Sequence, residues 1–127
     1  MRTRLVSSLV LLALVVVCGV MNINLMKNVS DKYISAAEEV RALVQGNDWD
    51  RARDTLQAYC QDWKDTLQWL QMLINHSDGD EVSRAMERIE AGIGNRDMSV
   101  CLEGCGELRE AAEHIYHRDA FTLGNIL

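Results

Sequence analysis

Apolar residues fill the start of the chain and then recur at helical spacing. Residues 5–23, LVSSLVLLALVVVCGVMNI, form an uncharged run of 19. From residue 27 onward apolar positions return every three or four residues, and no stretch alternates apolar and polar residues as a half-buried strand does. The pattern predicts an all-α protein, with one N-terminal transmembrane helix followed by a four-helix extracytoplasmic bundle.

The uncharged run is long enough to cross a membrane. At about 1.5 Å per residue it covers about 29 Å, close to the hydrocarbon thickness of about 30 Å. Arg2 and Arg4 precede it and the next basic residue is Lys27, so the positive-inside bias predicts a cytoplasmic N-terminus in the cell membrane. We expect residues 1–26 to form a cytoplasmic stub and signal anchor, and residues 27–127 an extracytoplasmic domain.

A cleaved signal peptide is the alternative for this segment. Its apolar region would cover about 7–15 residues and end in a small-x-small site, which VVVCGVMN does not offer. A lipoprotein modified at Cys18 would need small residues where three valines stand. The length of the run therefore favours an uncleaved anchor.

Three breaks, at residues 46–48, 77–80 and 92–97, divide the remainder into helices. Asp48, Asp78 and Asp97 suit the N-caps of the second, third and fourth helices. The expected helices run from the membrane to about residue 45, from 49 to about 75, from 79 to the third break, and from 98 to about 118.

An internal similarity links the two halves of the bundle. AAEEVRALVQGNDW, residues 36–49, aligns with AMERIEAGIGNRDM, residues 85–98, at an offset of 49. Two stacked αα-hairpins of similar design would explain the match. A chance resemblance between helical segments would explain it equally well.

The second helix is apolar over most of its circumference. One stripe includes Tyr59 and Trp63, Trp69 lies on another face, and Gln68 belongs to a thin polar line. Such a helix is expected at the centre of a bundle, buried on several sides. The predicted core residues are Trp63, Leu67, Trp69, Leu70, Ile74, Met86, Ile89, Leu108 and Ile115.

Four residues are weak candidates for metal ligands: His76, Cys101, Cys105 and His114. Two thiolates and a histidine can hold zinc, but a tight Cys-x-x-Cys pair is missing. Small core residues explain the cysteines better, and a disulfide from Cys60 to Cys101 or Cys105 is the next alternative. His76 is expected at the C-terminal end of the second helix, bonded to its last carbonyls. No cofactor is predicted.

The C-terminal segment FTLGNIL is unusually apolar for a chain end. We expect the tail either to fold back over the bundle, with a bend at Gly124, or to present a docking surface to a partner. The residues concerned are Phe121, Leu123, Ile126 and Leu127.

Charge and motifs limit the function. Residues 27–127 carry 11 Lys and Arg against 19 Asp and Glu, a net charge of −8, which argues against binding nucleic acid. No P-loop, G-x-S-x-G or H-E-x-x-H motif is present, so we expect no enzyme.

The overall layout resembles a known family. It combines a basic N-terminus and one apolar span with the segments WKDTLQWLQMLINHSDGDEV, AMERIEAGI and FTLGNIL; the sharpest points are Trp63, Ile74-Asn75-His76 and the final Asn125-Ile126-Leu127. Over nearly the whole chain this is similar to the domain-of-unknown-function family forty-three sixty-three, small single-span proteins of endospore-forming Firmicutes. The resemblance implies a bacterial source, a membrane-anchored helical domain and no established activity.

The sequence thus favours a scaffold or interaction module of the bacterial cell envelope without catalysis. Its expected partners are the lipid bilayer, through residues 5–23, and an unknown envelope protein. A small-ligand or metal sensor is the alternative, and it would use the region of Trp69, His76, Cys101 and Cys105.

Overall fold

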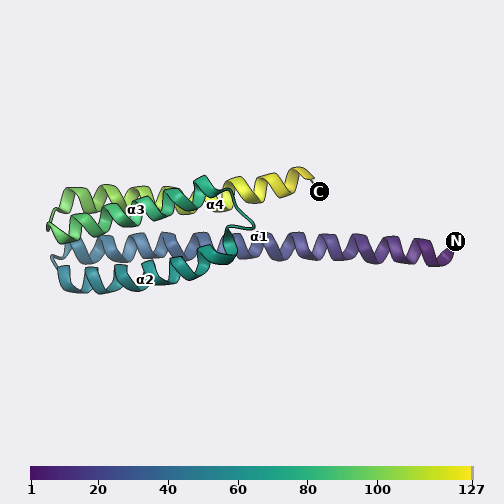
Figure 1. The fold of residues 1–127 in the computed structure, drawn as a ribbon, viewed down its shortest axis with the longest axis horizontal. Helices are drawn as coiled ribbons and strands as arrows, with labels where there is room; N and C mark the ends of the chain where they lie inside the picture. The colour runs from purple at the N-terminus through teal and green to yellow at the C-terminus, as the bar shows by residue number, and fades with distance from the viewer. Residues whose placement is uncertain (127) are drawn as a thin grey trace.

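The described part of the chain is all-α, as the periodicity predicted, and it forms four helices because the expected span and the first bundle helix are one. The computed structural model describes the backbone of residues 1–126 and the side chains of residues 1–117, and this part contains no strand. The helices are α1 (Arg2–Gln45), α2 (Trp49–Leu70), α3 (His76–Gly94) and α4 (Met98–Ile126). Figure 1 shows α1 as a long rod, with the other three helices packed along its C-terminal half.

The helix α1 joins the apolar span and the first bundle helix without a break. Residues 1–18 are all exposed, whereas buried positions recur from Met26 to Val44. No glycine or proline interrupts residues 20–45, so nothing in the sequence ends the helix between its two halves. In the described part of the chain, α1 is the one helix long and apolar enough to cross a membrane.

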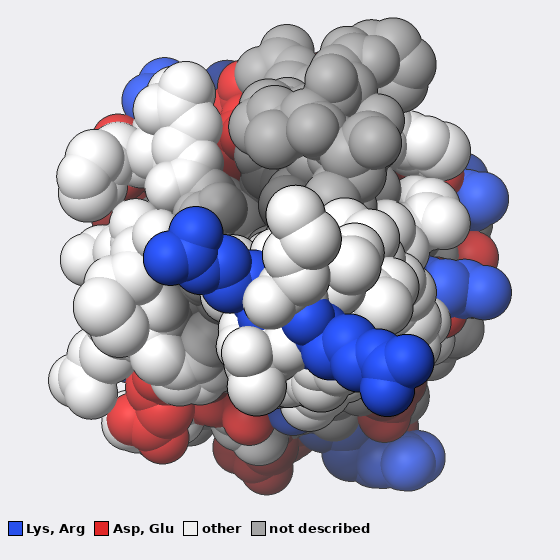
Figure 2. All heavy atoms as spheres, turned by 90° about the vertical axis from the view of Figure 1, so that its right-hand side faces the viewer, with Lys and Arg blue, Asp and Glu red and all other residues white. Residues whose placement is uncertain are grey.

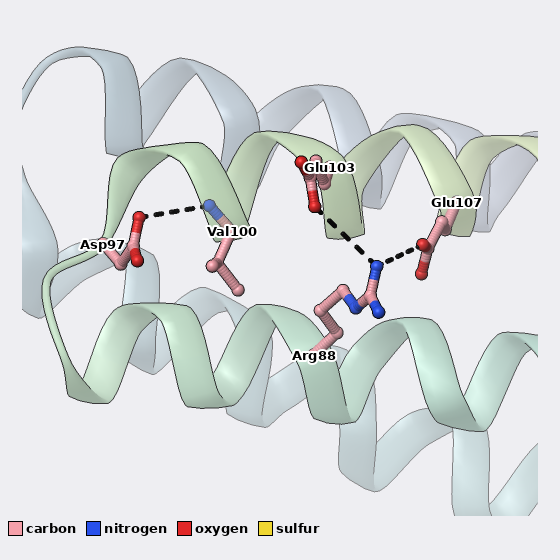
Figure 3. Close-up of polar contacts among 5 residues, drawn as sticks. All are labelled: Arg88, Asp97, Val100, Glu103 and Glu107. Carbon is pink, nitrogen blue, oxygen red and sulfur yellow. Dashed lines mark hydrogen bonds and ion pairs between the residues drawn. The ribbon is translucent and has the colours of Figure 1, made fainter.

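The two hairpins, α1–α2 and α3–α4, close with the same turn. A residue with a left-handed backbone follows each first helix: Asn47 with φ 58° and Arg96 with φ 49°. The next residue, Asp48 or Asp97, accepts a hydrogen bond from the backbone N–H three positions further on, as Figure 3 shows for Asp97. Both turns therefore match at the offset of 49 residues, with the predicted aspartate caps in place.

Buried positions repeat at the same offset. The matched buried pairs include Ala36 and Ala85, Val40 and Ile89, Val44 and Ile93, Ala52 and Cys101, Leu56 and Cys105, and Trp63 and Ala112. The two stacked αα-hairpins expected from the sequence are therefore present as structural repeats.

The central bundle helix is α4, not α2 as the apolar circumference predicted. A Cβ added at Gly104 would lie 2.7 Å from Ile89 Cγ1, which shows how closely the α3 and α4 backbones approach. At two equivalent positions α2 has the larger side chain, Thr55 where α4 has Gly104 and Trp63 where α4 has Ala112. The helix α2 packs less extensively against the other helices than α4 does.

Most of the predicted core is buried. Among the nine positions, Leu67 is only partly buried and Trp69 is 38% exposed. The expectation for Trp69 was wrong, since α2 has less helix contact than α4 and does not cover this ring, which lies in its last turn. The buried set consists of Trp63, Leu70, Ile74, Met86, Ile89, Leu108 and Ile115.

The junction between α2 and α3 lies earlier than the sequence predicted. The helix α2 ends at Leu70 rather than near residue 75, and α3 begins at His76 rather than after Asp78. His76 therefore stands at a helix N-terminus, where it cannot bond the final carbonyls of α2, and Asp78 is buried in the first turn of α3. The helix is followed by a tight turn, in which Leu73 N–H donates to Leu70 O at 2.8 Å. Because apolar residues in this turn keep nearly the spacing of a helix, the sequence pattern does not show where α2 ends.

The helix α4 continues beyond its expected end near residue 118. Its backbone is helical through Ile126, without the bend expected at Gly124. The side chains of the candidate docking tail, from Phe121 to Leu127, lie outside the described residues.

Candidate functional site

A groove of about 630 Å³ lies between α2 and α3. It lies on the less extensively packed pair of helices, since α2 contacts α3 less than α4 does. Apolar residues of both helices form its floor, and charged and amide side chains form its rims. The floor includes Leu56, Trp63, Leu67, Met86 and Ile93.

Trp63 joins three helices at the base of the groove. Its indole Nε1–H donates to Ser83 Oγ of α3 at 3.0 Å, and the Ser83 hydroxyl donates to Gly79 O at 3.2 Å. The ring stands edge-on to Tyr33 of α1, with centroids 5.0 Å apart and planes at 81°. The hydrogen bond and the aromatic contact together fix the position of Trp63 in the floor of the groove.

A polar cluster behind Trp63 fixes α2 to α1. The buried Tyr33 donates its hydroxyl to Asp62 Oδ2 at 2.7 Å, and Lys32 Nζ lies 2.6 Å from the same oxygen. Lys32 and then Tyr33 hold the pKa of Asp62 below its ordinary value, because both stabilise the carboxylate. Burial, and then the bond to Asp62, raise the pKa of Tyr33, so this hydroxyl stays protonated and serves as a donor.

The rims of the groove carry opposite charges. Arg53 and Lys64 line the α2 side, whereas Glu87 and Glu90 line the α3 side. Cys60 is half-buried in the α2 wall, and burial, assisted by Glu90, raises the pKa of its thiol. The groove can therefore bind a ligand with an apolar face flanked by charges of both signs, and its cysteine is not activated as a nucleophile.

The sequence did not single out Ser83, Glu87 or Glu90. Their spacing of i, i+4 and i+7 places them on one face of α3, and this is the signal that could have found them. The groove itself has no sequence signal, because it depends on how far apart two helices stand.

The structure separates the residues of the predicted ligand or metal site. Trp69 and His76 flank the α2–α3 turn, whereas Cys101 Sγ lies 3.8 Å from the carbonyl of Ile89. Thirteen residues of α3 separate His76 from Ile89, about 20 Å along the helix axis. These side chains therefore do not share one pocket.

The cysteines of α4 are free thiols buried in the core. Cys101 packs against Gly92, where an added Cβ would lie 2.7 Å from its sulfur. Burial raises the pKa of the Cys105 thiol to about 11, with a smaller contribution from Cys101. Metal ligation requires thiolates, so this environment opposes it.

His114, the other metal candidate, links α4 to α3. Its Nδ1 lies 3.3 Å from Glu81 Oε2, and its Nε2 lies 3.9 Å from Glu110 Oε1. Over the described residues, no group of three or more His, Cys, Asp and Glu side chains is placed to hold a metal ion.

A further polar cluster connects the outer faces of α3 and α4. Arg88 pairs with Glu107 and lies 3.8 Å from Glu103, as Figure 3 shows. All three side chains are about half exposed, so the pairs contribute little to stability, about 0–1 kcal/mol each.

Comparison with known proteins identifies the family of the chain. A family model described as "Domain of unknown function (DUF4363)" matches residues 20–126. The chain belongs to this family. The match begins within the apolar span and covers the whole bundle, in agreement with the resemblance in the sequence. No curated protein and no solved structure matches the chain.

Proposed function

We propose that the protein is a membrane-anchored, extracytoplasmic interaction module of the cell envelope without catalysis. The apolar half of α1 is the anchor, and the bundle presents the α2–α3 groove to one helix of another envelope protein. The observation that carries this proposal is the groove, which has an apolar floor and charged rims. It belongs to a bundle whose first helix, α1, also contains the apolar span.

The dimensions and chemistry of the groove support a helical partner. Its lining on α2 extends from Arg53 to Leu67, about 21 Å at helical rise, which equals about four turns. An amphipathic helix would place its apolar face on the floor and opposite charges against each rim. The burial-raised pKa of Cys60 and the wide separation of the cysteines from His76 give no support to a metal sensor.

Site-specific photo-crosslinking in native membranes tests the groove. A photoreactive residue at Gln57, which lines the groove, should give a protein adduct. The matched control is Ala58, the next residue, which is exposed and outside the groove lining. Charge reversal by Glu90→Lys should abolish the Gln57 adduct. Equal adducts from both positions, or none from either, would contradict the proposal.

The orientation has its own test. A reporter that is active only after export, fused at the C-terminus, should be active if the bundle lies outside the cytoplasm. A silent reporter in a chain that is expressed and membrane-bound would reverse the orientation.

A further inference from the structure

Three large apolar side chains are exposed together at the turn between α2 and α3. Trp69 is 38% exposed, Met72 82% and Leu73 45%. In the described part of the chain after Leu25, these are the large hydrophobic side chains that remain exposed. We call these three residues the turn patch.

The register of α1 and α2 gives the height of the turn patch above the apolar span. Lys32 pairs with Asp62, so these two positions of the antiparallel helices stand side by side. Trp69, seven residues after Asp62 in α2, then lies level with residue 25 of α1, and Met72 and Leu73 follow in the turn just after the end of α2. If the Tyr33–Trp63 contact sets the register instead, Trp69 lies level with a residue of α1 about two positions closer to the bundle. By either contact the turn patch lies at the end of the run 5–23.

Figure 1 shows the same arrangement, with the α2–α3 turn beside α1 where the rod leaves the bundle. The backbone of α4 also ends beyond this turn, alongside α1. Seen from the N-terminal end of α1, Lys and Arg side chains lie across the middle and on the right-hand edge of the described surface, uncharged side chains fill much of its left-hand part, and acidic side chains lie mainly along its lower edge (Figure 2).

We propose that the turn patch is a second membrane contact, which inserts into the headgroup layer beside the span. The inference rests on the anchor in the proposed function. The polar layer on each side of a bilayer is about 5–8 Å thick, and Trp69 lies within about 6 Å of the level of Ile23. Trp is enriched at this depth, since its ring is apolar and its N–H can bond to headgroups.

The composition around the turn favours lipid over a protein partner. Residues 66–77, TLQWLQMLINHS, contain no Asp, Glu, Lys or Arg, although such residues make up 25% of the chain. A protein interface would be expected to set charges around an apolar centre, as the groove rims do, whereas a segment without charges avoids the cost of placing a charged side chain at the edge of the hydrocarbon core. The patch is also continuous with the span through the adjacent surface of α1, where Met21 and Leu25 are exposed.

Tryptophan quenching by brominated lipid tests the contact. The full chain is reconstituted into phosphatidylcholine nanodiscs, with or without bromine on the acyl chains. Brominated lipid should quench part of the emission, Trp69→Phe should remove at least half of the quenched part, and Trp49→Phe should retain it. Trp49 is the matched control because it begins α2, at the opposite end of the bundle. The double variant Met72→Glu/Leu73→Glu should reduce quenching of Trp69 while the helical circular dichroism is unchanged.

Cys18, which lies in the span, separates failure of the contact from failure of the anchor. In the inserted chain this thiol should be inert to a water-soluble maleimide, although the structure leaves its side chain exposed. A protected Cys18 with equal quenching in wild type and Trp69→Phe overturns the contact and leaves the anchor intact. A reactive Cys18 overturns the anchor and the contact with it. A protein adduct from a photoreactive residue at Met72, without quenching of Trp69, would assign the turn patch to a protein partner instead.

Discussion

Replacing Trp63 by alanine should destabilise the bundle by about 3–5 kcal/mol. The side chain is 3% exposed, and burial of a tryptophan removes about 150–250 Å² from water, about 4–6 kcal/mol at 25 cal/mol per Å². Alanine retains a small part of this, while the hydrogen bond to Ser83 and the edge contact with Tyr33 are lost. The space opens into the groove, so water can enter it and the cost stays within the range usual for large-to-small substitutions.

Urea unfolding of the full chain in detergent micelles, followed by circular dichroism at 222 nm, measures this loss. Gln68→Ala is the control, since Gln68 is exposed on the same helix and its change should lie within about 0.5 kcal/mol. Trp63→Phe retains a ring against Tyr33 but loses the N–H donor, so it should cost about 1–2 kcal/mol. A Trp63→Ala variant as stable as the Gln68→Ala variant would show that α2 does not dock through this ring.

Two further predictions concern α4 and the polar cluster on α1 and α2. Gly104→Ala should destabilise the bundle by about 1–3 kcal/mol, because the added Cβ would lie 2.7 Å from Ile89. Gly106→Ala should stabilise it by about 0.5–1 kcal/mol, because nothing lies within 4 Å of the added Cβ. Thermal unfolding of both variants in parallel measures this contrast, and equal shifts in melting temperature would refute the close approach of α3 and α4. Asp62→Asn should lower stability at neutral pH by about 0.2–1 kcal/mol, since the pair is partly exposed. The pKa of Asp62 is lowered from 3.8, so its contribution is present above that value and lost as pH falls through the lowered pKa. The melting temperatures of wild type and Asp62→Asn should therefore converge as the pH falls below 3.8 and through the lowered pKa, and a constant difference would contradict the assignment.

Local features of the fold could be predicted from the sequence. Asp48 and Asp97 mark two helix starts, since an aspartate at this position satisfies a free backbone N–H of the first turn. The uncharged run of residues 5–23 predicted a helix long and apolar enough to cross a membrane, and α1 contains such a segment, exposed on the bundle.

Packing partners could not be predicted, because periodicity shows which residues are apolar and not what covers them. Trp69 has the helical spacing of a core residue, but it is 38% exposed near the end of α2. The groove depends on the distance between α2 and α3, which no periodicity in the sequence expresses. His76 was misplaced since the short turn after Leu70 interrupts the helix without interrupting its spacing.

The unbroken helix α1 couples the bundle mechanically to the apolar run. From Ile23 to Gln45 the rod extends about 33 Å beyond the apolar run, and residues 20–45 contain no glycine or proline to act as a hinge. A change of 10° in the tilt of the span would therefore move the far end of the bundle by about 6 Å. Under the proposed function, a helix bound in the groove would exert a torque on the span, and the proposed contact of the turn patch with lipid would resist that rotation.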